Sequence, residues 1–560
     1  MPDRDDERHP RLDRRTLISS AAALTASATA LPALGDQARQ AAPAAAGRAA
    51  GPGPGGKPLF PYVGLRDWVQ ALDDHGLLMR IGRMDQDAYE ITALAYRLTD
   101  QFGWYGAPAV IVDEVKIGGR WVRGPLVINH QGHWDTETML FGIEPRRRSS
   151  GADTYRLALG HVAGLIDAHG GRLPEIAPLP VDAGRAPVKE VILRGDAIDL
   201  GRFAFIQSNP GDAGRYITTG SVFTADPELG MNFGTYRCQL RGPRTIGINP
   251  EPGQRAWKMF TAQRERGEKL ARVSIVLGQD PMMWMVSGSA LTKGIRDDEL
   301  AITGGLRGRA VEVVKSETND HMVPASAEMV IEGEVPLQEP LQPEGPFGEM
   351  YGYLGLRKEE NFWMRVTCVT HRRDPWILNQ FTGATRGFCT APMEAFALYR
   401  LKKLVPGLVA LHSPVEATGW TFVAIDKTRP GQALEAGRQI ARIIGIAKIV
   451  VVVDQDVDVL DRSAVMHAVG SRWQPYPAAE ILRDMMGMPL DPSAPNRPKS
   501  SKIVIDATRQ WPGEGGPQVY PALNRDLLVQ LAPGAFPLVD SQWERYLGGW
   551  QRQGCPPRTP

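Results

Sequence analysis

The sequence predicts a mixed α/β protein, of the α+β kind, with three folded segments, and three observations support this. Helical spacing and short apolar runs alternate over residues 58–170. Residues 171–375 contain many short strand-like runs between Gly, Pro, Asn and Asp turns, which is typical of a barrel or sandwich. Helices and apolar strands alternate again over 376–510, as in a small parallel α/β domain.

Composition excludes several classes of protein. The chain has 560 residues, 43% of them hydrophobic and 23% charged, which are ordinary values for a globular protein. Lys plus Arg is 64 and Asp plus Glu is 63, so the net charge of +1 predicts neither nucleic acid nor an anionic membrane as a partner. The four cysteines are far apart and predict no disulfide framework. No apolar run approaches the roughly 20 residues of a membrane-spanning helix.

The first residues, 1–57, are expected to lie outside the fold. The pair Arg14-Arg15 precedes a mild Ala/Leu/Ser/Thr stretch, and Ala28-Thr29-Ala30 offers a cleavage site. This pattern predicts a twin-arginine export signal and a periplasmic or extracellular protein, followed by a disordered linker over 36–57. The alternative is a basic, low-complexity tail on a cytoplasmic protein.

In the first folded segment the spacing of apolar residues predicts three helices and two buried strands. The helices are expected at 67–78, 89–102 and 153–168, and the strands at 109–112 and 126–128. In the central segment a helix is expected at 254–270 among nine strands. These strands are expected at 188–193, 216–224, 235–240, 244–248, 273–277, 283–286, 310–315, 327–334 and 362–371.

The third segment is predicted to alternate helices at 391–405, 432–444 and 463–470 with strands at 421–425, 448–453 and 502–506. A Pro- and Trp-rich tail, 511–560, is expected to wrap a neighbour or the body. Asp454, Asp456 and Asp458 resemble the start of a calcium loop, but the sixth and twelfth positions are valines. We therefore expect these carboxylates to cap the following helix.

Two carboxylates in the stretch 343–350 are candidates for a catalytic pair. Glu344 and Glu349 flank Pro346 and Phe347 in a segment that cannot be a regular helix. Two carboxyl groups facing one partly apolar cavity split their pKa values, so that one holds a proton near neutral pH, as a general acid requires. The alternative is a surface loop with two solvated glutamates.

A second stretch, 226–237, predicts a turn followed by a strand that carries Asn232 and Arg237. Together with Glu344 and Glu349, it resembles the UbiD family of reversible decarboxylases, which use prenylated flavin mononucleotide (prenylated FMN). The resemblance runs in order from about residue 60 to about residue 510. It also covers the stretches 188–191, 195–196, 209–212, 216–218, 317–325, 345–353, 452–458 and 505–508.

The resemblance implies both an architecture and an activity. The central segment would be a split β-barrel that binds prenylated FMN, supplied by a flavin prenyltransferase, and the C-terminal α/β domain would join subunits into a dimer or hexamer. The reaction would be non-oxidative decarboxylation of an aromatic or α,β-unsaturated carboxylic acid. Arg237 would bind the substrate carboxylate, Glu349 would donate the proton that replaces the lost carboxyl group, and Glu344 would pair with Arg237 and tune it.

The resemblance also implies a divalent metal, typically manganese, on the flavin phosphate, with potassium nearby. Its ligands are an Asn, a His and a Glu; Asn232 and Glu299 match two of them. No histidine stands at the third position, where Gln254 and Arg255 occur. Gln254 could supply an amide oxygen, or Arg255 could bind the phosphate directly with weak or no metal. The residues expected to bind the cofactor are Asn232, Thr235, Tyr236, Arg237, Gln254, Arg255, Ser287 and Gly288.

Two other functions stay open. An exported flavin-binding protein on the same scaffold, without decarboxylase activity, is compatible with the missing histidine. A hydrolase that uses the paired carboxylates on a sugar is a weaker possibility. Lys448 either reaches the phosphate or is simply the first residue of a strand.

Overall fold

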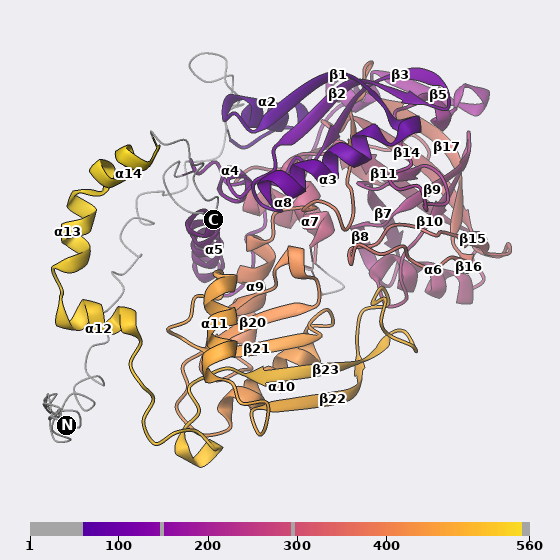
Figure 1. The fold of residues 1–560 in the computed structure, drawn as a ribbon. Coiled ribbons are helices and arrows are strands. Elements are labelled where there is room, and N and C mark those ends of the chain that lie inside the picture. Colours follow the sequence, from indigo (N-terminus) through magenta and orange to yellow (C-terminus); the bar gives the residue numbers. More distant parts are fainter. Residues whose placement is uncertain (1–59, 146–150, 290, 293–296, 552–560) are drawn as a thin grey trace, which may run out of the picture. The chain divides into compact units, whose positions relative to one another are not determined.

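The structure is a computed structural model that describes residues 60–145, 151–289, 291–292 and 297–551 (Figure 1). All of them belong to the second of the chain's two contact units, Arg48–Pro560. The predicted export signal, 1–57, lies outside the described residues and stays a prediction. Among the described residues, no helix combines the length and the apolar character that a bilayer crossing requires.

The first folded segment forms a sheet of four strands. Helix α2 (Leu65–Asp74) packs on it through Leu65, Trp68 and Leu72. The predicted helix 67–78 ends early because Gly76 has a positive φ of 70°, and a strand that the periodicity did not reveal begins at Leu78. The strand order is β1 (Leu78–Asp85), β2 (Ala109–Ile117), β3 (Arg120–Ile128) and β18 (Ile377–Asn379), with helices α3 (Glu90–Phe102) and α5 (Gly151–Ala168) as predicted.

The central segment is a nine-stranded sheet that curls into a half-barrel, which confirms the predicted split barrel (Figure 1). Its neighbours pair antiparallel throughout. Helix α6 (Arg255–Glu265) packs against β7 and β8. The order is β6 (Tyr216–Ile217), β9 (Cys238–Gly242), β10 (Thr245–Ile248), β17 (Trp363–His371), β14 (Met329–Pro336), β11 (Leu270–Leu277), β7 (Ser221–Asp226) and β8 (Gly230–Thr235), with β5 (Val191–Arg194) beside β17.

Two smaller sheets complete the segment. The first has three strands, in the order β13 (Met322–Pro324), β12 (Glu312–Lys315) and β4 (Leu179–Pro180). The second pairs β15 (Gln342–Glu344) with β16 (Lys358–Asn361).

One predicted strand, 283–286, is wrong: these residues belong to helix α7 (Pro281–Gly288). Asp280 caps the helix by accepting hydrogen bonds from the backbone N–H groups of Met282 and Met283, and Pro281 occupies its first position. Nearly every residue of α7 is buried, so its apolar run lacks the helical periodicity that would distinguish it from a buried strand.

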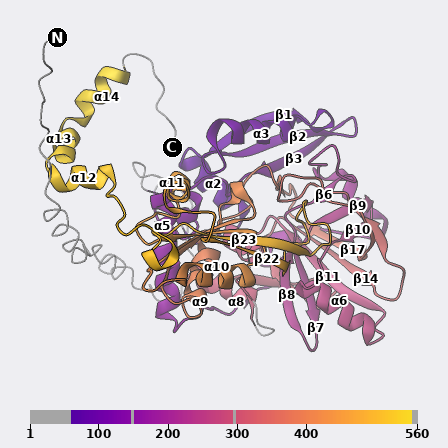
Figure 2. The ribbon, with the colours of Figure 1, turned by 60° about the horizontal axis from the view of Figure 1, so that its bottom comes forward.

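The third segment is a five-stranded sheet with helices on both faces (Figure 2). Its three central strands are parallel, as predicted, and the edge strands β19 and β22, which were not predicted, pair antiparallel with them. Val450 and Val452 pack with α10 (Gln432–Ile443), while Val451 and Val453 pack with α11 (Arg462–Arg472). This follows from the alternation of side chains along a strand. The order is β19 (Leu408–His412), β20 (Trp420–Ile425), β21 (Ile449–Asp454), β23 (Lys499–Asp506) and β22 (Ala479–Met486), and α9 (Ala391–Leu401) precedes it.

The expectation that Asp454, Asp456 and Asp458 cap the next helix is wrong. Asp461 caps α11, and Asp454 and Asp456 accept hydrogen bonds from Arg472 near the end of that helix. Because Arg472 lies one helix length away in sequence, only the folded chain reveals this pairing.

After the sheet the described tail forms α12 (Asn524–Leu531), α13 (Ala535–Ser541) and α14 (Trp543–Gln551). These helices carry exposed large apolar side chains, among them Leu531, Leu538 and Trp543.

Candidate active site

The backbone of the loop after β15 brings the two predicted carboxylates to one place. Its conformation is fixed by Asp212, whose carboxylate accepts hydrogen bonds from the backbone N–H groups of Gly348 (2.8 Å) and Asn209 (2.9 Å). The backbone N–H of Ala213 donates to the carbonyl of Pro346 (2.8 Å). As the sequence predicts, the loop is not helical. Asp212 is a positioning residue whose role the sequence did not indicate.

Arg237, two residues past β8, meets both carboxylates. Its Nε and Nη2 donate to the two carboxylate oxygens of Glu344, at 2.9 and 2.7 Å, and its Nη1 donates to Oε1 of Glu349. The side chain of Glu344 is fully buried, and those of Arg237 and Glu349 are 9% and 8% exposed. The three residues predicted to be catalytic therefore form one contiguous, nearly buried cluster.

Two aromatic rings form the apolar side of this cluster. The centre of the Phe347 ring lies 5.1 Å from the guanidinium carbon of Arg237, and 4.6 Å from the centre of the Tyr216 ring. The Tyr216 hydroxyl donates to Oε1 of Glu344 (3.2 Å). The Phe347 ring therefore lies within cation–π distance of the guanidinium, and the two rings give the ion pairs an apolar neighbour.

The charges in the cluster do not balance. One guanidinium faces two carboxylates, so the net charge is −1 when all three groups are ionised. Burial raises the pKa of Glu349, although Arg237 opposes the rise. Glu344 accepts both parallel N–H bonds of the guanidinium fork, so Glu349 is the carboxyl group better suited to hold a proton.

A second cluster joins β8, α6 and the start of α8 (Glu299–Leu306). Arg255 donates from Nη1 to Oε1 of Glu299 (2.5 Å) and from Nη2 to the carbonyl of Met231 (2.6 Å). Glu299, 4% exposed in its side chain, also accepts from the Thr292 hydroxyl (3.0 Å). Burial raises the pKa of Glu299 to about 7 against the opposing charge of Arg255.

Neutral polar groups lie beside this second cluster. The buried amide of Asn232 donates to the hydroxyl of Tyr236 (3.4 Å), which also accepts from the backbone N–H of Ala256 (3.4 Å). The hydroxyls of Thr235 and Ser287 are 2.7 Å apart, so β8 and α7 face each other here. Gly288 follows Ser287, and a Cβ at Gly288 would lie 2.9 Å from the Phe388 ring. The residues predicted to bind the cofactor thus gather on adjoining elements.

The donor set does not fit a divalent metal. Gln254, the proposed substitute for histidine, is exposed, and its amide oxygen accepts a hydrogen bond from the backbone N–H of Glu251 (2.6 Å). The cation on Glu299 is the guanidinium of Arg255. In the part of the chain that the structure describes, no group of three or more His, Cys, Asp and Glu residues could hold a metal ion. A hard divalent cation needs several oxygen or imidazole ligands around one point.

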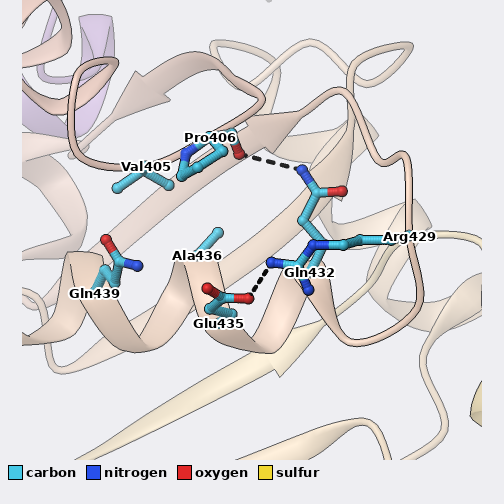
Figure 3. A pocket seen from close by; sticks show the side chains of 7 residues that line it. All are labelled: Val405, Pro406, Arg429, Gln432, Glu435, Ala436 and Gln439. Atoms are coloured by element: carbon cyan, nitrogen blue, oxygen red, sulfur yellow. Dashed lines mark hydrogen bonds and ion pairs between the residues drawn. The ribbon is translucent and has the colours of Figure 1, made fainter.

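A cavity of about 460 Å³ opens beside this cluster. It is lined by Pro227, Glu228, Gly230, Met231, Asp297, Asp298 and Glu299. A smaller pocket in the third segment, drawn in Figure 3, has polar groups that already pair with each other. There Arg429 pairs with Glu435, and Gln432 donates to the carbonyl of Pro406 (3.1 Å). We therefore place the candidate site at the two arginine clusters.

Three further side chains are engaged in contacts of their own. Lys448 directly precedes β21, and its ammonium group pairs with Asp491 (2.9 Å). Cys389 is fully buried, with its sulfur 3.4 Å from the Thr136 hydroxyl, and the amide of Gln380 donates to the Thr385 hydroxyl (2.8 Å).

Comparisons with known proteins match most of the chain. The family model described as "3-octaprenyl-4-hydroxybenzoate carboxy-lyase Rift-related domain" matches residues 180–385, and that of the C-terminal domain matches 387–507. An uncharacterized protein of Archaeoglobus fulgidus is 31% identical over 475 residues, which cover 82% of this chain and 94% of that protein.

The fold is also similar to those of solved structures. Vanillic acid decarboxylase of Sedimentibacter hydroxybenzoicus in its closed form is 26% identical, with a TM-score of 0.71 over 83% of this chain and 96% of that one. An evolved dimeric form of the UbiD-class enzyme HmfF from Pelotomaculum thermopropionicum, in complex with prFMN, is 27% identical. Its TM-score is 0.67 over 83% of this chain and 97% of that one.

Proposed function

Because this chain belongs to the UbiD family of carboxy-lyases, we propose that it decarboxylates an aromatic or α,β-unsaturated carboxylic acid, reversibly and without oxidation, using prenylated FMN. The observation that carries the proposal is the buried cluster of Arg237, Glu344 and Glu349. A flavin-binding protein without catalysis has no need of a buried carboxyl group with a raised pKa.

The polar residues on β8 and α7 fit the cofactor. Asn232, Thr235, Tyr236 and Ser287 present amide and hydroxyl groups, which suit the polyol chain of a flavin nucleotide. Gly288, the last residue of α7, follows Ser287. When bound, the prenylated flavin supplies an electron sink for the carbon atom that loses carbon dioxide. The potassium ion stays a prediction, and the manganese prediction lacks a fitting donor set.

Arg237 would orient the substrate carboxylate. Its Nη1 contacts Glu349 in this structure, and Glu344 occupies the opposite fork. A substrate carboxylate that takes the Nη1 position displaces the carboxylate of Glu349 from its only cationic partner in the cluster. The pKa of Glu349 then rises further, because burial no longer has an opposing charge.

Glu349 would therefore hold the proton that the product needs at the carbon that lost its carboxyl group. Glu344 keeps Arg237 fixed during the exchange, since it binds Nε and Nη2 and receives the Tyr216 hydroxyl. In the reverse direction Glu349 would accept the proton as carbon dioxide is added.

The test begins with protein made in a host that also carries a flavin prenyltransferase. We expect a flavin absorption spectrum, the mass of prenylated FMN, and release of carbon dioxide from at least one acid in a panel of aromatic and α,β-unsaturated acids. In deuterated water the product should carry deuterium at the decarboxylated carbon. Flavin binding without turnover of any acid would favour the binding-protein alternative, and a folded protein without flavin would overturn both.

Export and assembly complete the proposal. The Arg14-Arg15 pair supports export through the twin-arginine route, which carries folded proteins that already hold a cofactor. The exposed apolar side chains on α12, α13 and α14 support assembly into a dimer or hexamer. Cell fractionation and light scattering of the full chain test these two points.

A further inference from the structure

The cluster at Arg255 poses a question that the proposed function leaves open: what binds the negatively charged end of the cofactor. The resemblance implies a divalent metal, but the donor set does not fit one. Arg255 stands at the position of the missing histidine, and its side chain lies on Glu299, which the resemblance identifies as a metal ligand. The cationic group of the site therefore comes from the chain itself.

Three elements fix this guanidinium. Arg255 is the first residue of α6, an 11-residue helix, and its guanidinium donates to Glu299 on α8 and to the carbonyl of Met231 on β8. Its side chain is 19% exposed, so it is held in place and still reaches the surface of the site. Asn232, the other matched ligand, directly follows Met231 in the chain.

The chemistry of a guanidinium suits a phosphate. Its planar N–H groups match two phosphate oxygens, and it stays charged at every pH that a protein tolerates. The start of α6 adds the partial positive charge of a helix N-terminus. A metal held by Glu299 would have to displace Arg255 from its carboxylate, which would leave two cations side by side.

We propose that Arg255 takes the place of the divalent metal in this chain, and that its guanidinium binds the flavin phosphate without any metal ion. This inference rests on the proposed function, because it assumes that a flavin nucleotide is the cofactor. It differs from that proposal in naming an anchor that a chelator cannot remove.

The first test uses FMN as the probe and the purified full-length chain. We expect the chain to hold less than stoichiometric manganese or any other divalent metal by elemental analysis, and the dissociation constant for FMN to be unchanged by EDTA. Stoichiometric manganese together with loss of FMN in EDTA would overturn the inference and leave the decarboxylase proposal intact. Failure to bind FMN or prenylated FMN in any condition would overturn the proposed function as well.

Substitutions then test Arg255 itself. Arg255→Met should weaken FMN binding by about ten- to hundredfold, because a charge-assisted contact is lost. The matched control, Lys258→Met, removes an exposed positive charge from the same helix and should leave the dissociation constant unchanged. Equal affinities in the Arg255→Met and wild-type proteins would overturn the inference.

The Arg255→His variant distinguishes loss of the phosphate contact from loss of the fold. It restores the Asn, His and Glu donors that the resemblance implies, so FMN binding should become dependent on manganese and sensitive to EDTA. If this variant binds FMN in EDTA as tightly as the wild type does, Arg255 is not the anchor. Thermal melting of each variant shows whether its fold is intact.

Discussion

The two arginine clusters of this site are built from the same kinds of residue but hold their carboxylates differently. Arg237 joins two carboxylates, Glu344 and Glu349, on one guanidinium, whereas Arg255 pairs with Glu299 and also donates to the carbonyl of Met231. Burial raises the pKa of Glu349 and of Glu299 alike, so burial alone does not distinguish the clusters. An excess of one carboxylate can be relieved by a proton, which suits the first cluster to proton transfer. The guanidinium of Arg255 is held in place by Glu299 and the carbonyl of Met231, which suits the second cluster to a fixed contact with an anion.

Glu349→Gln should have the largest effect on activity, because it removes the second carboxyl group that Arg237 holds. Loss of a general acid should lower kcat by about 10²- to 10⁴-fold, while FMN binding stays unchanged. Rates of carbon dioxide release and FMN titration measure the two effects. Glu360→Gln, at an exposed position on neighbouring β16, is the matched control and should keep full activity. Near-normal turnover in Glu349→Gln would contradict the role of Glu349.

Arg237→Lys keeps the charge of the first cluster and removes its fork geometry. An ammonium group cannot make the two parallel bonds to Glu344 and also reach Glu349, so substrate orientation should suffer. We expect kcat/KM to fall by about 10²-fold, since misplacement of a reacting group costs this much. Arg357→Lys, at an exposed position before β16, should have no effect. An unchanged kcat/KM in Arg237→Lys would show that the fork does not bind substrate.

The pH dependence of the free energy of unfolding tests whether Glu349 holds a proton in the folded protein. Its folded-state pKa is raised, mainly by burial, so the folded protein binds this proton more tightly than the unfolded chain does. The resulting stability is fully present below the ordinary carboxyl pKa of about 4.3, and it is lost as the pH rises through the raised value. Compared with the wild type, Glu349→Gln should therefore gain relative stability as the pH rises.

Urea unfolding of the two proteins at several pH values measures this difference. Decarboxylation by the wild type should also fall at alkaline pH, by about tenfold for each pH unit above the pKa of the general acid. A pH-independent difference in the free energy of unfolding would contradict a raised pKa at Glu349.

The sequence predicted the clusters better than their surroundings. Arg237, Glu344 and Glu349 were identifiable because the resemblance rests on the short motifs that carry them. The α7 helix was not, because a fully buried helix lacks the apolar periodicity on which the prediction depends. Asp212 was missed as a positioning residue, since its partner Gly348 is distant in sequence. The contact of Arg255 with Glu299 likewise became visible only when α6 and α8 met in space.

A substitution at Gly383 should have the smallest effect on activity, because Gly383 contacts the backbone of Glu349 and neither arginine side chain. Its φ of +77° disfavours any side chain, and a Cβ there would collide with the carbonyl oxygen of Glu349 and lie 2.7 Å from the backbone nitrogen of Gly352. Gly431 has a similar φ of +74° with open space around its Cβ position, so it is a matched control.

Gly431→Ala should cost about 1–2 kcal/mol in the free energy of unfolding, from the backbone conformation alone. Gly383→Ala should cost about 1–3 kcal/mol more, because the clash is with backbone atoms that cannot move aside without shifting Glu349. It should also lower kcat without weakening FMN binding, since the Arg255 cluster does not depend on this loop. Equal losses of stability in the two variants would show that the loop absorbs the extra atom, and that the position of Glu349 is not fixed by this contact.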